Sequence, residues 1–208
     1  MPIDLNKYKN ILFDLGNVIL NIDYTLTVKS FQELELSNFE NLFSQAQQQQ
    51  LFDVYEKGEI SSAQFRSALK TFCKKNTTDH AIDKAWNSML LDLPAERLDL
   101  LGRLKQTHRT FLLSNTNEIH IIAFHEYLEK NFKTSDLSAY FEKMYLSYQI
   151  GMRKPDIEIF EFIIKENNLN PMETLFIDDS IQHVESAKKL GIEAYWLNVK
   201  KETILDLF

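Results

Sequence analysis

Short apolar runs, each bounded by polar residues, occur once near the start of the chain and repeatedly in its second half. Their length and apolar character are typical of strands that are covered on both faces, as in a parallel sheet. The last run follows Gly191, which ends the helical pattern before it. The sequence therefore predicts five buried strands, at residues 11–13, 110–113, 143–146, 174–177 and 193–197.

The stretches before three of these runs carry apolar residues at helical spacing. Strands that alternate with helices indicate an α/β domain in which right-handed crossovers connect parallel strands. We therefore predict an α/β fold with a Rossmann-like parallel sheet as its core. The positions that define the three helical faces are Leu98, Leu101 and Leu104; Ile159, Phe160, Ile163 and Ile164; and Val184, Ala187 and Leu190.

The segment from about 23 to 92 differs, because it contains no strand-like run and carries Phe and Leu at helical spacing. Ser61 or Ser62 would cap a helix after a turn at Gly58, since Ser favours helix N-termini. The glutamine-rich run 45–50 predicts a solvated helix face. The apolar faces are predicted from Phe39, Leu42 and Phe43 and from Phe65, Ala68, Leu69 and Phe72.

This difference predicts two domains. Residues 1–20 and 93–208 would form the α/β core domain, and residues 21–92 would form an α-helical bundle inserted as a cap. A length of 208 residues suits one core domain with a modest insertion.

The composition of the chain limits the kinds of molecule that it is expected to bind. The chain is 44% apolar and 25% charged, as ordinary globular proteins are, with a formal net charge of −7. This charge disfavours nucleic acid and anionic lipid, so an anionic ligand needs a local positive field. The single Cys73 excludes an internal disulfide and is expected to be a small buried hydrophobe. We predict no signal peptide and no membrane span, and expect a cytoplasmic monomer or weak homo-oligomer.

Polar residues follow the predicted strands at the edge where parallel sheets bind ligands. Asp14 and Gly16 follow the first strand, and glycine lets the backbone approach a ligand closely. Ser114 and Asn115 follow the second strand, where a hydroxyl and free N–H groups can form an anion cradle. Each pattern taken alone also fits an ordinary turn or helix cap.

Two further sites complete the set. Lys154 precedes Pro155 at a predicted helix start, and Asp178 and Asp179 follow the fourth strand. Two adjacent carboxylates repel one another unless a cation lies near them, and hard oxygen ligands suit Mg²⁺. Together the four sites supply a nucleophile, a hydroxyl contact, a charge neutraliser and a metal site. Their combination points to phosphoryl chemistry.

The order of these motifs resembles that of the haloacid dehalogenase-like (HAD) superfamily. Asp14 matches the nucleophilic aspartate of that family, Ser114 its second-motif hydroxyl and Lys154 its third-motif lysine. Asp178 and Asp179 match its acidic pair.

Two longer stretches narrow the resemblance. Residues 13–19 (FDLGNVI) and 146–155 (LSYQIGMRKP) are similar to the subgroup of α-D-glucose-1-phosphate phosphatase and related sugar phosphatases. The similarity covers nearly the whole chain, and the helical insert falls where that family has its cap domain. The resemblance implies a Mg²⁺-dependent phosphatase that hydrolyses a small phosphorylated metabolite, a phosphomonoester such as a sugar phosphate.

The resemblance also implies roles for individual residues. An aspartyl-phosphate would form on Asp14, and water would then hydrolyse it. The implied metal ligands are Asp14, the carbonyl group of Gly16, Asp179 and Asp178, the last directly or through water. The implied phosphate contacts are Ser114, Lys154 and the N–H groups near Asn17 and Asn115.

Two positions depart from the family pattern. Phosphatases of this family usually carry a second aspartate as general acid and base, two residues after the nucleophile, where this chain has Gly16. Such a proton donor typically contributes about 10²–10⁴-fold in rate. The subgroup shows the same substitution, so activity is still expected. His183 stands where the pattern usually has Asn; a helix-surface histidine is expected there, and a hydrogen bond to the acidic pair is the alternative.

The cap and its hinge are the remaining source of a proton-transfer group. Asp23, Tyr24 and Glu56 are the candidates, and each also fits an ordinary surface role. The turn at 55–59 is predicted to reach into the site and to contact the substrate. Closure of a cap excludes water and strengthens local electrostatic interactions.

Alternative functions stay open. A C–halogen hydrolase of the 2-haloacid dehalogenase type also lacks the second aspartate but needs no Mg²⁺. A catalytically inactive HAD-like binding module is suggested by Gly16 alone. A phosphoryl-accepting signalling receiver combines similar residues in the reverse order and has no large insert.

Overall fold

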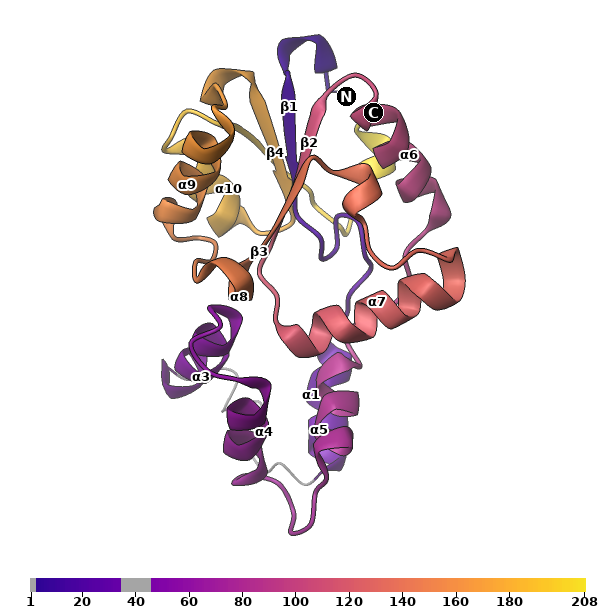
Figure 1. The fold of residues 1–208 in the computed structure, drawn as a ribbon, viewed down its shortest axis with the longest axis vertical. Coiled ribbons are helices and arrows are strands. Elements are labelled where there is room, and N and C mark those ends of the chain that lie inside the picture. The colour runs from indigo at the N-terminus through magenta and orange to yellow at the C-terminus, as the bar shows by residue number, and fades with distance from the viewer. Residues whose placement is uncertain (1–2, 35–45) are drawn as a thin grey trace.

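The computed structural model describes residues 3–34 and 46–208 of the chain. Its centre is a five-stranded sheet in the order β3-β2-β1-β4-β5, and every neighbouring pair is parallel (Figure 1). This confirms the predicted α/β fold and its parallel sheet. The strands are β1 Asn10–Phe13, β2 Arg109–Ser114, β3 Lys143–Leu146, β4 Thr174–Asp178 and β5 Glu193–Trp196.

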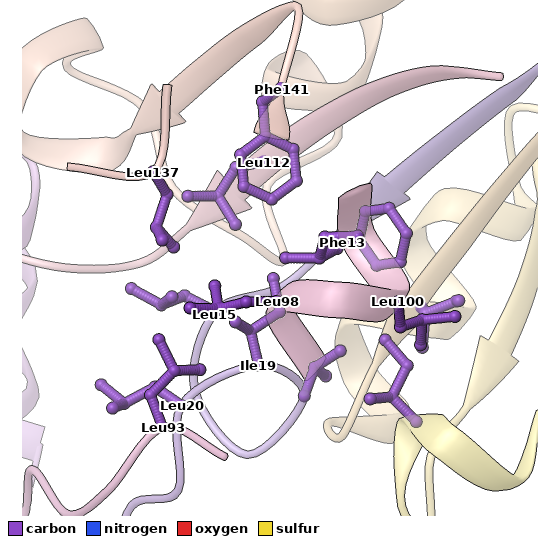
Figure 2. Packing of buried hydrophobic residues seen from close by; sticks show 14 of the residues in the cluster. Phe13, Leu15, Ile19, Leu20, Leu93, Leu98, Leu100, Leu112, Leu137 and Phe141 are labelled. Carbon is purple, nitrogen blue, oxygen red and sulfur yellow. The ribbon is translucent and has the colours of Figure 1, made fainter. Parts of the chain in front are cut away.

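Alternate residues of each central strand point to opposite faces of the sheet, so each face has its own hydrophobic core. In β1, Phe13 packs into one cluster of buried residues and Leu12 into the other. Figure 2 shows the first cluster, in which Phe13 lies close to Phe141, with a ring-centroid distance of 6.1 Å. A strand buried on both faces needs apolar residues at every position, which explains the short continuous runs in the sequence.

Helices cover both faces of the sheet, as the predicted crossovers require (Figure 1). α6 (Ala95–Lys105) and α7 (Glu118–Phe132) supply residues to the cluster that contains Phe13. α9 (Ile157–Asn167) and α10 (Ile181–Lys188) supply residues to the opposite cluster. The remaining core helix is the short α8 (Ser147–Ile150), directly after β3.

The helical faces predicted around the core agree with these elements. Leu190 lies just beyond the end of α10 at Lys188, but it still packs against the same cluster as Val184 and Ala187. Short 3-10 helices complete the core, at Leu5–Lys7, Ser138–Tyr140, Pro171–Glu173 and Ile204–Asp206.

In the described part of the insert, four helices lie together beyond the carboxyl edge of the sheet (Figure 1). They share a third hydrophobic cluster, which is rich in aromatic side chains and also takes in Ile119 of α7. Ser61 caps α4 through the backbone N–H of Gln64, and the Gln64 side chain accepts a hydrogen bond from the Ser61 N–H. The helices are α1 Tyr24–Glu33, α3 Ala46–Glu56, α4 Ser62–Lys70 and α5 Asp79–Asn87.

Two details of the predicted insert are wrong. Phe72 was placed on the apolar face of Phe65 and Leu69, but it is 46% exposed because α4 ends at Lys70 and the helical spacing no longer applies. Cys73 is half-buried rather than buried, and its Sγ donates a hydrogen bond to the Leu69 carbonyl group. The predicted face of Phe39, Leu42 and Phe43, and the start of the glutamine run, lie outside the described residues.

The two chain segments that enter and leave the insert are hydrogen-bonded to each other. Asn21 N–H donates to the Asp92 carbonyl group at 2.9 Å, and Leu91 N–H donates to the Asn21 carbonyl group at 3.0 Å. A short antiparallel bridge joins Ile22 and Leu90. The insert is therefore connected to the core through two paired segments, close to the boundaries predicted at 20/21 and 92/93.

Among the helices of the described residues, none has the length and apolar character needed to cross a membrane.

Candidate active site

The chemistry-bearing residues meet at the carboxyl edge of the sheet. Asp14 directly follows β1, Ser114 is the last residue of β2, and Asp178 is the last residue of β4. They lie beside a cavity of about 560 Å³ that the core and the insert line together. Asp14, Ser114, Lys154 and Asp179 line this cavity, whereas Asp178 is fully buried next to it.

Lys154 is the centre of the charged cluster. Its ammonium group donates to Asp14 Oδ1 at 2.6 Å, to Asp178 Oδ2 at 2.6 Å and to the Leu113 carbonyl group at 3.0 Å. The side chain is completely buried, and an ammonium group has three N–H donors, so every donor is used. In this arrangement Lys154 neutralises carboxylates rather than holding a free donor toward the cavity.

Three carboxylates surround the place where a cation would fit. Oxygen atoms of Asp14, Asp178 and Asp179 lie within 4.8 Å of one another. Burial raises the pKa of Asp14 to about 7, against the opposing effect of Lys154. Burial opposes ionisation of Asp178 too, but Lys154 and His183 lower its pKa to about 2. A cluster of hard oxygen donors that repel one another fits Mg²⁺, and Asp14, Asp178 and Asp179 are the residues that would hold it.

Asn17 and Gly16 shape the loop after Asp14. The Asn17 side chain donates to Asp179 Oδ2 at 2.8 Å and so orients that carboxylate. The Asn17 N–H donates to the Leu20 carbonyl group at 2.7 Å and is thus already used within the loop. A Cβ atom on Gly16 would lie 2.8 Å from Ile22 Cδ1, so a larger residue there would have to displace the Ile22 side chain.

The side chains of Ser114 and Asn115 differ in the hydrogen bonds that they make within the protein. The Ser114 hydroxyl is buried at the cavity wall, and the one hydrogen bond that it makes to the described residues is a long one, 3.5 Å to the Asn115 carbonyl group. The Asn115 side chain instead donates to the Lys154 carbonyl group at 2.7 Å and accepts from the Lys154 N–H at 2.9 Å. Asn115 therefore fixes the segment that carries Lys154, and Ser114 keeps a hydroxyl for a ligand.

The expectation that His183 lies on the helix surface is wrong. Its Nδ1 lies 2.9 Å from Asp178 Oδ1 and 3.0 Å from Oδ2, so the alternative hydrogen bond to the acidic pair is the one that forms. His183 stands in the first turn of α10, directly after the loop that carries the pair, which turns its ring back toward the carboxylate.

The three candidates from the insert lie in different places. Asp23 caps α1 by accepting hydrogen bonds from the Thr25 N–H and hydroxyl, and it does not line the cavity. Tyr24 and Glu56 do line it. Burial and nearby carboxylates, Asp14 foremost, raise the pKa of Tyr24. Burial raises the pKa of Glu56, with Arg153 opposing.

Arg153 is a cavity residue to which the sequence gave no role. One guanidinium nitrogen lies 2.5 Å from Asp53 Oδ1 and the other 2.9 Å from Glu56 Oε2, so it joins the loop before Lys154 to α3. A second ion pair, Lys57 to Asp156 at 3.0 Å, connects the same two segments. Sequence spacing carries no signal for such pairs, because their members are about a hundred positions apart.

An aromatic group lines the far end of the cavity and also lacked any sequence signal. The Trp86 ring stacks on Phe52 at a centroid distance of 5.0 Å and on His120 at 4.9 Å. His120 Nδ1 lies 2.7 Å from Asn87 Oδ1, and burial lowers the pKa of His120 to about 3. His120 is therefore a neutral, buried part of this wall, which Phe124 extends.

The comparisons with known proteins agree with this geometry. A parallel α/β sheet with a buried lysine and an acidic cluster at its carboxyl edge defines a class of hydrolases, and the family model described as haloacid dehalogenase-like hydrolase matches residues 11–197. This chain belongs to the haloacid dehalogenase-like hydrolase family. The predicted family is thus confirmed.

Individual relatives cover most of the chain. It is 34% identical over 187 residues to a D-ribitol-5-phosphate phosphatase of Bacteroides thetaiotaomicron, covering 90% of each protein. A HAD family enzyme of the same organism, solved in complex with magnesium and inorganic phosphate, is 38% identical with a TM-score of 0.83, covering 94% of this chain and 96% of that one. A HAD-like hydrolase of Porphyromonas gingivalis is 30% identical with a TM-score of 0.81, covering 91% of each.

Proposed function

We propose that this protein is a Mg²⁺-dependent phosphatase that hydrolyses a small sugar or polyol phosphate through an aspartyl-phosphate on Asp14. The observation that carries the proposal is the cluster of Asp14, Asp178 and Asp179, held around Lys154 beside a cavity that the core and the insert line together. The related D-ribitol-5-phosphate phosphatase and the related structure with magnesium and phosphate support the same chemistry.

Each residue of the cluster has a chemical task. Asp14 attacks phosphorus with the carboxylate oxygen that Lys154 does not hold. Lys154 lowers the charge of the cluster so that a phosphate dianion can approach. The Ser114 hydroxyl donates to a phosphoryl oxygen, and Asn115 keeps Lys154 in place. A bound Mg²⁺ would polarise the phosphoryl oxygens and offset their charge.

The insert selects the rest of the substrate. The phosphate end of the cavity recognises only the phosphoryl group, so discrimination falls to the residues opposite it. Asp53, Glu56 and Arg153 offer polar groups that suit hydroxyls, and the aromatic wall limits the length of the carbon chain. We propose that residues 21–92 act as a cap domain over the core, with a hinge at the paired segments near Asn21 and Asp92.

The alternative of a C–halogen hydrolase is disfavoured by the same cluster, since that chemistry has no use for a Mg²⁺ site. An inactive binding module would not explain why Asp14 is left with one free carboxylate oxygen at the cavity wall. A cytoplasmic monomer or weak homo-oligomer stays a prediction.

The test measures phosphate release from D-ribitol 5-phosphate and a panel of sugar phosphates, with Mg²⁺ or with EDTA. We expect release that requires Mg²⁺ and disappears in the Asp14→Asn variant. Release of halide from a 2-haloacid, with none of phosphate from any phosphoester, would overturn the proposal.

A further inference from the structure

A phosphatase that acts on an alkyl phosphate has to deliver a proton to the departing oxygen, because an alkoxide is a poor leaving group. Asp14 is occupied as the nucleophile, and Gly16 two residues later has no side chain. The proton must therefore come from another group at the cavity wall. This inference rests on the proposed function.

Most ionisable groups around the cavity are unsuited to this task. Lys154 uses all three of its donors within the cluster, and the Arg153 guanidinium is paired with Asp53 and Glu56. His120 is neutral, lies in the aromatic wall and is fixed to Asn87. His183 also lines the cavity, but its Nδ1 is held against the Asp178 carboxylate.

The carboxyl and hydroxyl groups of the insert differ in how well they are placed to transfer this proton. Asp23 is engaged at the cap of α1 and lies outside the cavity wall. Asp53 has an exposed side chain (41%) that is bound to Arg153. Tyr24 carries a phenol, whose raised pKa keeps it protonated near neutral pH, so it cannot take a proton from water in the return step. Glu56 is the group that remains.

The surroundings of Glu56 suit proton transfer. Its Oε2 is buried beside the Arg153 guanidinium, at 2.9 Å from Nη2. Glu56 lines the cavity, and no hydrogen bond to its Oε1 is found among the described residues, so this oxygen is available to a ligand. Burial raises the pKa of Glu56 and so favours its protonated form. The positive charge of Arg153 acts in the opposite direction and favours the ionised form. Gly58, two residues later, packs so closely on α8 that a Cβ atom would lie 2.1 Å from the Tyr148 carbonyl oxygen, which fixes this turn on the core.

We propose that Glu56 is the general acid and base of this enzyme, and that Arg153 is the positioning residue that aims it at the leaving oxygen. In the first step, an Asp14 oxygen bonds to phosphorus, the ester P–O bond breaks, and the Glu56 carboxyl proton passes to the leaving oxygen to give the alcohol. In the second step, water attacks the aspartyl-phosphate and gives a proton to the Glu56 carboxylate. The bond between phosphorus and Asp14 breaks, inorganic phosphate leaves, and both carboxyl groups return to their starting state.

The test compares two substrates of similar size that differ in their need for a proton. The leaving group of 4-nitrophenyl phosphate departs without one, whereas benzyl phosphate releases an alkoxide. We measure the single-turnover rate of phosphoenzyme formation in the Mg²⁺-loaded full chain. In Glu56→Gln this rate should fall about 10²-fold or more with benzyl phosphate and change little with 4-nitrophenyl phosphate. The latter should give a burst of nitrophenolate followed by slow turnover, since the second step still lacks its base.

Glu33→Gln is the matched control, because it makes the same change from carboxyl to amide at an exposed position of the insert, in α1. Arg153→Gln should show the selectivity of Glu56→Gln in weaker form, which a merely structural loss would not produce. An equal fall with both substrates, or no fall with either, overturns the role of Glu56. If the unmodified protein releases phosphate from neither substrate, the proposed function itself fails.

Discussion

The two ends of the cavity are lined by different kinds of side chain. At the core end, charged groups satisfy one another: Lys154 bonds to Asp14 and Asp178, and Asn17 bonds to Asp179. At the insert end, Trp86 and the rings stacked on it form an apolar wall. The core end can therefore bind only one kind of chemical group, whereas the aromatic wall can change its shape without disturbing the charged cluster. Phosphoryl binding and selection of the rest of the substrate are separated in space, and Glu56 lies on the insert side of the cavity.

The strongest way to test this separation is to remove the nucleophile. Asp14→Asn should lower turnover at least about 10⁴-fold, since no other group can form the covalent intermediate. The unfolding free energy should change much less than the rate, because an amide fits the same space. Steady-state phosphate release and urea unfolding measure the two effects. Asp99→Asn, at an exposed position of α6, is the control and should change neither.

At the insert end, we expect substitution to lower the unfolding free energy strongly. Trp86 is buried and contacts Phe31, Phe52, Phe65 and His120. Trp86→Ala should reduce the unfolding free energy by about 3–5 kcal/mol through the cavity that it leaves. The exposed Phe72 provides the control, because Phe72→Ala should stay within about 0.5 kcal/mol. Urea unfolding of both variants measures this, and similar losses would mean that the aromatic cluster is not the core of the insert.

The contact between the two regions can be tested at Gly58. This residue has φ +69° and meets the Tyr148 carbonyl oxygen, so alanine is both strained and obstructed. Gly58→Ala should reduce the unfolding free energy by about 1–3 kcal/mol and raise KM, because α3 can no longer sit on α8. Gly102→Ala in α6 would place its Cβ atom in ordinary contact with the Tyr140 ring, 3.9 Å from Cε1, and should be neutral or stabilising. Thermal unfolding and steady-state kinetics of the pair measure the difference, and a neutral Gly58→Ala would contradict this account.

The smallest expected effect is a pH dependence of stability that comes from His120. Its pKa is lowered to about 3 in the folded protein, against about 6.5 in an unfolded chain. The unfolded state thus binds more protons between these values, so stability falls as the pH drops below 6.5. Between pH 6.5 and 5.5 the protein should lose about 1 kcal/mol that the His120→Gln variant keeps. Chemical denaturation at both pH values measures this, and the exposed His80→Gln should behave as the unmodified protein does.

The sequence predicted the core end far better than the insert end, for a physical reason. A strand buried on both faces is apolar throughout, so each strand is visible locally, and a parallel sheet brings the residues that follow its strands together. Asp14, Ser114 and Asp178 are therefore found from topology alone. The contact of Arg153 with Asp53 depends on how the insert sits on the core, which no local pattern records.

The same reason accounts for the errors. Phe72 continues a helical spacing after the helix has ended at Lys70, and the end of a helix depends on a few capping contacts rather than on periodicity. His183 has the spacing of a helix surface, but the first turn of α10 faces the acidic pair.

The hydrogen bonding of Lys154 has one more consequence, for the order in which ligands bind. When ionised, Asp14, Asp178 and Asp179 carry three negative charges against the single positive charge of Lys154, which leaves two. This is the charge that one divalent cation cancels. Without that cation, the site would repel a phosphate dianion; with it, the site would be neutral and rich in dipoles that favour an anion. We therefore expect the cation to bind before the substrate.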